Sequence, residues 1–436
     1  MPVPGDLTQL DERTQNSTLF SGTAAIIQLF QQLAKPRAQH FRHTGHSPQA
    51  APSMFFEHYS FFFLTDASPF PALDGRKVPV ANYFQQLERL GASPELLLPV
   101  RAEPPRGCLA KALEVWQRLR PYGGYYTNER LASDAIARVA RAEAPVVFVA
   151  PARLMSLVPA LKAVNPATKV ALILNDAQWT MNLEALLFGL GWYPGGARHD
   201  LLKGLLLPSA LFRELNAYVD ADCVLLQTER ELSRLPWLRN SAVVAPNGVE
   251  QPKTPWVGQD SHVFAVQANF TNRRADKLRP FVTRIWPEIR AANPALELEL
   301  FGPGSVLPAW AENIEGLRYV GVVDDLDAYL SIKRGFLVPL EHASGISNTV
   351  LRGLALDMPL VITRSSSLGV RSLLENRTNV QVARNAKEFV IQTLKLDPSH
   401  AEGRPQQIGS WSANLRAILQ KLGISIPDAT TKALDT

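Results

Sequence analysis

Residues Pro339 to Pro359 read Pro-Leu-Glu-His-Ala-Ser-Gly-Ile-Ser-Asn-Thr-Val-Leu-Arg-Gly-Leu-Ala-Leu-Asp-Met-Pro, and this stretch decides the fold. The apolar run from Gly335 to Leu340 predicts a strand, and the Ser/Gly segment after it predicts a loop. Apolar residues recur at helical spacing beyond Ser347, so a helix is expected to begin there. A strand-loop-helix junction points backbone N–H groups and the positive helix end at one place, which suits a diphosphate.

Apolar segments on both sides of this stretch predict further strands that alternate with helices. In the first half, strands are expected near residues 61–64, 146–149, 169–174, 223–227 and 242–245. In the second half, they are expected at residues 262–267 and 335–340 and within the segments 296–304 and 317–326. Near-continuous apolar strands alternating with helices indicate parallel sheets covered on both faces. A chain of 436 residues has room for two such domains.

The composition predicts a soluble globular protein with a mild excess of positive charge. Hydrophobic residues make up 46%, charged residues 19%, and the net charge is +5. This excess favours anionic partners such as nucleotide diphosphates or lipid phosphates. The sequence contains no Lys/Arg block with interleaved aromatics, so nucleic acid is not expected as a partner. The two cysteines, Cys108 and Cys223, give neither a disulfide framework nor a zinc motif, which favours a reducing cytoplasm.

Residues 1–55 are predicted to be a polar N-terminal extension. Its helical patch at residues 22–33 either packs on its own domain or lies on a membrane surface. Four histidines lie in or near it (His40, His43, His46 and His58), but no Cys or carboxylate joins them, so a metal site is not expected. No apolar run approaches ~18 residues, and the N-terminus lacks signal-peptide features. We therefore expect a cytoplasmic protein, with peripheral contact at the inner membrane surface as an alternative.

The quoted stretch resembles the nucleotide-sugar loop of retaining glycosyltransferases of family 4. Those chains commonly read Pro-Leu-x-x-Gly-Ser-Gly-Ile-x-x-Lys-x-x-Glu-Ala-x-Ala-x-Gly-x-Pro-Val-Val. Residues 220–231 resemble the family's Ala-Asp-x-Val-x-x-x-Ser-x-x-Glu segment, and residues 243–250 resemble its Val-Pro-Asn-Gly-Val-Asp segment. Ser410-Trp411 resembles the Ser-Trp that opens the family's last helix. The resemblance covers about Phe61 to Leu422.

This resemblance implies the α/β GT-B fold, in which two Rossmann-like domains with parallel sheets face a central cleft. It implies an acceptor-binding domain at residues 56–252 and a nucleotide-sugar-binding domain at residues 256–405. Residues 406–425 would then form a C-terminal helix that packs back on the N-terminal domain.

The implied activity is retaining transfer of a sugar from a UDP- or GDP-sugar to a glycan, lipid-linked or other hydroxyl acceptor, in the synthesis of cell-envelope polysaccharide or glycolipid. The family reaction is thought to be front-face, without an enzyme nucleophile, a cofactor or a metal. Basic side chains and a helix N-terminus stabilise the departing diphosphate. Residues 324–327, Asp-Asp-Leu-Asp, look like a metal-binding Asp-x-Asp motif, but they match the family's helix start, where a carboxylate caps N–H groups.

The resemblance also suggests the site residues. Arg274 falls at the family's diphosphate-binding Lys, and Asn269 falls at its Arg; Arg274 and Asp176 are the catalytic candidates. The substrate-binding candidates are Gly75, Asn269, Arg273, Lys277, Glu341, Ser344, Gly345, Ile346, Ser347, Asn348, Thr349 and Arg352.

The chain departs from the family at three positions of the quoted stretch. The family's two glutamates fall on Ser344 and Arg352, and its Lys falls on Thr349. The second glutamate usually accepts hydrogen bonds from the ribose hydroxyls, whereas Arg352 has donors only. Arg352 is expected to bind phosphate or to pair with Glu341 or Asp357. Arg352 and Thr349, together with Asn269 in place of the family's Arg, favour an alternative function, a catalytically degenerate GT-B protein that partners an active glycosyltransferase.

Overall fold

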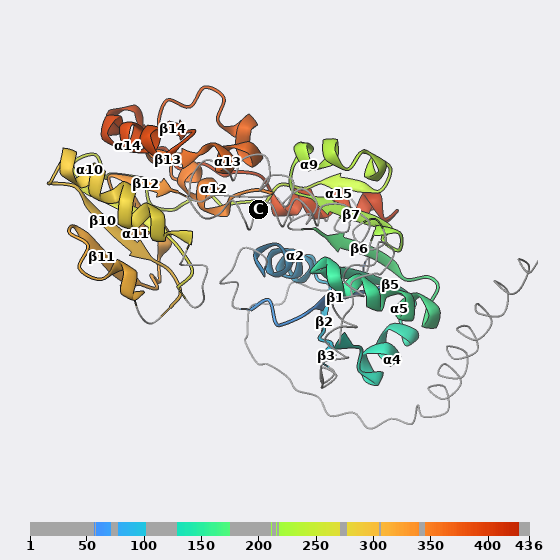
Figure 1. Cartoon of the computed structure of the whole chain (residues 1–436). Coiled ribbons are helices and arrows are strands. Elements are labelled where there is room, and N and C mark those ends of the chain that lie inside the picture. The colour runs from blue at the N-terminus through green and yellow to red at the C-terminus, as the bar shows by residue number, and fades with distance from the viewer. Residues whose placement is uncertain are drawn as a thin grey trace, which may run out of the picture.

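The computed structural model describes residues 56, 58–70, 77–101, 129–174, 211, 215, 218–270, 277–304, 307–339 and 345–426. These residues form two α/β domains, each built on a six-stranded sheet (Figure 1). Strands pair in parallel throughout both sheets, which confirms the expectation of two Rossmann-like domains. No helix within the described ranges is both long and apolar enough to cross a membrane.

The N-terminal sheet has the strand order β2-β1-β5-β6-β7-β8. Its strands are β1 (Tyr59–Thr65), β2 (Glu95–Leu97), β5 (Ala144–Ala150), β6 (Lys169–Ile173), β7 (Cys223–Leu226) and β8 (Ala242–Val244). Its main helices are α2 (Lys77–Arg89), α4 (Ser133–Arg141), α5 (Val158–Val164) and α9 (Glu229–Arg234). Successive strand residues face opposite sides, so the apolar runs supply two cores: α4 and α5 cover one, and α2 covers the other. A two-stranded antiparallel sheet of β3 (Val100–Arg101) and β4 (Glu129–Arg130) lies outside this sheet.

The C-terminal sheet has the strand order β11-β10-β9-β12-β13-β14. Its strands are β9 (Val263–Gln267), β10 (Glu297–Phe301), β11 (Leu317–Gly321), β12 (Gly335–Val338), β13 (Leu360–Thr363) and β14 (Val380–Ala383). Its helices are α10 (Trp286–Ala292), α11 (Leu326–Ser331), α12 (Asn348–Ala355), α13 (Arg364–Ser367) and α14 (Ala386–Lys395). The helices α10 and α14 cover one face, and α11 and α12 cover the other.

The last helix, α15 (Trp411–Lys421), packs on the N-terminal domain although it follows the C-terminal one in sequence (Figure 1). It begins at Ser410, whose side chain accepts a hydrogen bond from Ala413 N at 3.1 Å. Trp411 then packs edge-on against Tyr83 of α2, with 5.3 Å between the ring centroids. The helix α15 therefore contributes to the core that α2 covers in the N-terminal domain.

The chain crosses between the domains twice, and the two crossings are hydrogen-bonded to each other. Val249 N donates to Ile408 O at 2.7 Å, and Ile408 N donates to Val249 O at 3.0 Å. Gln251 Nε2 donates to Pro405 O at 3.0 Å beside this bridge. Residues 249–251 and 405–408 therefore form one hinge region between the two sheets.

Candidate functional site

The loop after β12 leads into α12 at the carboxyl end of the C-terminal sheet. Gly345 has φ +64°, a left-handed conformation that favours glycine over residues with a Cβ atom. Ser347 is the N-cap of α12, and its Oγ accepts a hydrogen bond from Val350 N at 3.4 Å. Val350, with Leu351 and Leu354, then anchors the helix in the core. The predicted helix start near Ser347 is confirmed, and the predicted strand is present at residues 335–338, whereas residues 340–344 lie outside the described residues.

Two side chains of the N-terminal domain bind this loop. Gln227, directly after β7, accepts a hydrogen bond at Oε1 from Ile346 N at 2.9 Å. Its Nε2 donates to Asn247 Oδ1 at 3.3 Å, and Asn247 Nδ2 donates to Asn348 Oδ1 at 2.7 Å. Gln227 is 7% exposed, Asn247 2% and Ile346 8%, so this contact is buried. The carboxyl ends of the two sheets therefore meet at the loop.

A capping box fixes the backbone of Gln227. Thr228 is the N-cap of α9, and its Oγ1 accepts a hydrogen bond from Glu231 N at 3.1 Å. Glu231 Oε2 in turn accepts from Thr228 N at 3.1 Å and from Gln227 N at 3.0 Å. This reciprocal bonding is the physical basis of the Thr-x-x-Glu spacing in the sequence. It holds the end of β7 in a defined position beneath the loop.

The loops after β9 and β10 lie beside the first turn of α12. Thr349 Oγ1 donates to the Oε1 of Gln267, the last residue of β9, at 3.3 Å. Asn269 follows two residues later, next to Phe270, whose N donates to Pro303 O at 2.7 Å. Gly302 has φ +136°, and a Cβ atom there would lie 1.9 Å from Ala268 O. Glycine at this position thus permits the close approach of the two loops.

Arg352 forms an ion pair with Asp327 across the neighbouring helices α12 and α11. Its Nη1 lies 3.0 Å from Asp327 Oδ1 and 3.2 Å from Oδ2. Burial raises the pKa of Asp327, and the charge of Arg352 opposes this only in part. Asp357, one of the expected partners, instead pairs with Arg377 at 3.0 Å. Glu341, the other expected partner, lies outside the described residues.

The acidic segment before α11 has the capping role expected of it. Asp325 is the N-cap residue, and its Oδ1 accepts a hydrogen bond from Ala328 N at 3.0 Å. Within the described part of the chain, no three His, Cys, Asp or Glu side chains gather in a way that suits a metal ion.

The structure places eight of the candidate residues. Gly345, Ile346, Ser347, Asn348, Thr349 and Arg352 lie in or just after the loop, while Asn269 follows β9 and Lys277 precedes the helical segment leading to α10. Arg274, Asp176, Gly75, Arg273, Glu341 and Ser344 lie outside the described residues and stay predictions. In the sequence, Gln227 and Asn247 stand out only as parts of motifs that mark the fold. The available signal was that Gln227 directly follows β7 and Asn247 follows β8 by three residues, because ligands of such sheets bind at the carboxyl ends of the strands.

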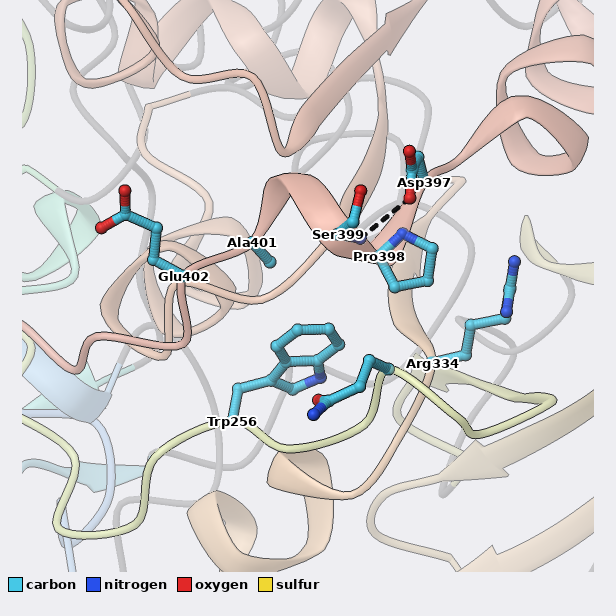
Figure 2. Close-up of a pocket in the computed structure, with 8 residues that line it drawn as sticks. Trp256, Arg334, Asp397, Pro398, Ser399, Ala401 and Glu402 are labelled. Atoms are coloured by element: carbon cyan, nitrogen blue, oxygen red, sulfur yellow. Dashed lines mark hydrogen bonds between the residues drawn. The ribbon is translucent and has the colours of Figure 1, made fainter.

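A pocket of about 450 Å³ opens at the opposite edge of the C-terminal sheet (Figure 2). Its lining residues are Trp256, Gln259, Arg334, Asp397, Pro398, Ser399, Ala401 and Glu402. Arg334 precedes β12, so the pocket lies at the amino ends of the strands. Asp397 Oδ1 accepts from Ser399 N at 2.9 Å, and Trp256 Nε1 donates to Lys333 O at 2.7 Å. These groups already have hydrogen-bond partners, and the pocket lies at the amino ends of the strands, whereas ligands of such sheets bind at the carboxyl ends. We therefore assign the candidate site to the loop before α12.

Comparisons with known proteins agree with this architecture. Residues 261–396 match the family model "Glycosyl transferases group 1". Sucrose-phosphate synthase from Thermosynechococcus elongatus is structurally similar, with 13% identity, a TM-score of 0.54, and coverage of 86% of this chain and 97% of that chain. Anabaena HepE in complex with UDP and glucose shows 10% identity, a TM-score of 0.49, and coverage of 86% and 98%. A comparison with curated proteins found no match. The chain thus has the two-domain GT-B fold, and its residues 261–396 match the model of the glycosyl transferases group 1 family.

Proposed function

We propose that this protein is a retaining glycosyltransferase that moves a sugar from a UDP- or GDP-sugar to a hydroxyl acceptor. The observation that carries the proposal is the loop at Gly345–Ser347, which opens α12 at the carboxyl end of β12 and faces the N-terminal domain. Backbone N–H groups at the start of a helix are suited to phosphate oxygens, and the helix dipole favours their negative charge.

In this proposal, the C-terminal domain binds the donor and the N-terminal domain binds the acceptor. The diphosphate lies at the loop, and Arg274 supplies the positive charge that stabilises it as it departs. Such stabilisation is a large contribution to the rate of group transfer in a site that excludes water. The acceptor hydroxyl attacks on the face that the diphosphate leaves, so neither an enzyme nucleophile nor a metal is required. Asp176, which follows β6 by three residues in the sequence, is proposed to contact the acceptor.

The acceptor is proposed to be a glycan or a lipid-linked sugar in envelope polysaccharide or glycolipid synthesis. The net charge of +5 fits acceptors and surfaces that carry phosphate, and peripheral contact with the inner membrane belongs to this proposal. Co-sedimentation with anionic vesicles tests the membrane contact separately from the reaction.

Binding of UDP and GDP tests the donor proposal directly. A nucleotide present at ~100 times its Kd stabilises the folded state by about 2.7 kcal/mol, which a thermal-shift scan detects. The nucleotide that binds then selects the sugar donors, and release of free nucleotide from these donors measures turnover. Failure of both UDP and GDP to bind would contradict the proposal.

A second candidate function is a degenerate GT-B protein that binds nucleotide and partners an active transferase. Two observations favour it: Arg352 is engaged by Asp327, and Thr349 bonds Gln267 where the family has a lysine. This candidate predicts nucleotide binding without donor hydrolysis and without transfer to any acceptor. Turnover measurements therefore separate the two functions.

A further inference from the structure

Four residues form a continuous chain of hydrogen bonds between the two domains. It runs from Ile346 N to Gln227, from Gln227 to Asn247, and from Asn247 to Asn348, over distances of 2.9, 3.3 and 2.7 Å. Two of the residues belong to the N-terminal domain and two to the loop and first turn of α12. We call this set the interdomain amide chain.

The orientation of each amide in the chain follows from the backbone of the loop. Ile346 N–H is a donor, so Gln227 must present its carbonyl oxygen, Oε1, to it. The Nε2 of Gln227 then faces the oxygen of Asn247, whose Nδ2 faces the oxygen of Asn348. Because Gln227 and Asn247 are buried, an amide left without a partner would destabilise the folded state. The chain therefore favours one arrangement of the loop relative to the N-terminal domain.

Other hydrogen bonds also involve the helix α12 or the two domains, but none of those described below joins the loop backbone to the N-terminal domain. Thr349 bonds Gln267 within the C-terminal domain. Gln251 and the bridge between Val249 and Ile408 join the hinge segments. Gln227 differs from all of these because it reaches the loop backbone from the opposite domain. The capping box at Thr228 fixes the backbone of Gln227, so the Gln227 side chain reaches the loop from a defined position.

We propose that Gln227, supported by Asn247, is a positioning residue that sets the loop before α12 for the donor diphosphate. The inference rests on the proposed function and adds a role for the acceptor-side domain in donor binding. Gln227 accepts the hydrogen bond of the Ile346 N–H. The N–H groups of Gly345 and Ser347, on either side of Ile346, then bind the phosphate oxygens. Because the loop is already ordered before the donor binds, less binding free energy is lost in ordering the loop. Donor affinity then depends on the two domains being in contact, so domain approach and donor binding are coupled.

The test compares Gln227→Leu with Gln227→Glu and a control, Gln251→Leu. Hydrogen exchange of the peptide that contains Ile346 reports on the loop, and titration with UDP and GDP reports on the donor site. Gln227→Leu is expected to increase exchange at Ile346 and to weaken the nucleotide that binds by about 5- to 10-fold, the effect of one hydrogen bond. Gln227→Glu keeps an acceptor for Ile346 and is expected to keep its protection from exchange. Gln251→Leu alters only the hinge contact and should leave both measurements unchanged.

Several outcomes would overturn the positioning role. Unchanged exchange at Ile346 in Gln227→Leu would show that the contact does not order the loop. Tighter nucleotide binding in this variant would show that Gln227 blocks the site instead. If Gln227→Leu, Gln227→Glu and Gln227→Ala all fail to fold, the residue is structural. Failure of the proposed function looks different, because the wild-type protein would then bind neither UDP nor GDP, whereas faster exchange in Gln227→Leu would still establish the contact between the domains.

Discussion

Arg352 and Asp327 form a half-buried ion pair between α12 and α11, with 3.0 Å between Arg352 Nη1 and Asp327 Oδ1. Their side chains are 30% and 22% exposed, so water screens the pair less than it screens a surface pair. The guanidinium is therefore engaged by a carboxylate of its own domain. This relationship changes what a substitution of Arg352 is expected to do.

Arg352→Glu is expected to lower the stability of the folded state by ~1–2 kcal/mol, between the values typical of exposed and buried pairs. The new carboxylate would face the carboxylate of Asp327. Burial already raises the pKa of Asp327. The double variant Arg352→Glu/Asp327→Arg should recover most of the loss, and Arg404→Glu, in an exposed pair, should cost little. Denaturant unfolding measures all four proteins. A loss of UDP affinity without a loss of stability would show that Arg352 binds phosphate instead.

Gly345→Ala tests the loop itself. The residue has φ +64°, where a Cβ atom is strained, so the substitution should distort the loop and weaken nucleotide binding at least tenfold. The control is Gly423→Ala, because Gly423 has a similar φ of +69° but follows α15, on the N-terminal domain. Both variants carry similar strain, so equal nucleotide affinities in the two would place the donor elsewhere. Calorimetric titration of UDP and GDP decides the matter.

The sequence predicted the fold well where the signals were local. Gly345 and Ser347 mark the loop and the start of α12 because one adopts a left-handed conformation and the other caps the helix. The short edge strands β2 and β14 were not predicted. Each of these strands has a single buried residue, Leu97 in β2 and Ala383 in β14, so neither has the long, fully buried apolar run of the central strands.

The side-chain partners in the site were beyond sequence reasoning for a different reason. Gln227 and Ile346 are 119 residues apart, and Arg352 and Asp327 are 25 apart. Strand patterns place such residues at the same edge of a sheet but do not say which side chains meet there. For Arg352, the expected partner Asp357 lies nearer in sequence, yet Asp357 accepts a hydrogen bond from Arg377 instead.

Removal of divalent metal ions is expected to leave donor turnover unchanged. In the proposed reaction, a helix N-terminus and basic side chains stabilise the diphosphate, so a metal has no required role. Turnover is measured in EDTA and again after magnesium or manganese is restored. Strict dependence on either ion would contradict this prediction and the proposed mechanism.

Arg274→Ala is expected to lower kcat/KM for the donor by about 10- to 150-fold, because a charge-assisted hydrogen bond is worth roughly 1.5–3 kcal/mol. The control is Arg279→Ala, which removes an exposed arginine five residues further along the chain. Initial rates of nucleotide release at several donor concentrations give the comparison. Equal rates for the two variants would exclude Arg274 from the diphosphate site.

The last prediction concerns stability and pH in the core of the C-terminal domain. Glu299 of β10 is 1% exposed and bonds three side chains: Lys333 at 2.7 Å, Tyr329 at 2.6 Å, and Arg318. Burial alone would raise the pKa of Glu299, but hydrogen bonds from Lys333, Tyr329 and Arg318 outweigh burial and hold it below the ordinary value of 4.5.

A carboxyl whose pKa is lower in the folded state contributes stability above its unfolded pKa and loses that contribution as pH falls through the folded pKa. The free energy of unfolding should therefore fall as the pH drops below about 4.5. Glu299→Gln removes this dependence and leaves Lys333 buried without its counter-charge, at a cost of ~3–5 kcal/mol near neutral pH. Glu297→Gln, on the same strand but exposed, serves as the control. Denaturant unfolding from pH 3 to 7 measures this dependence. The free energy of unfolding should fall more steeply towards acid pH in the wild type and Glu297→Gln than in Glu299→Gln. Parallel curves for all three proteins would show that Glu299 is not the group that titrates.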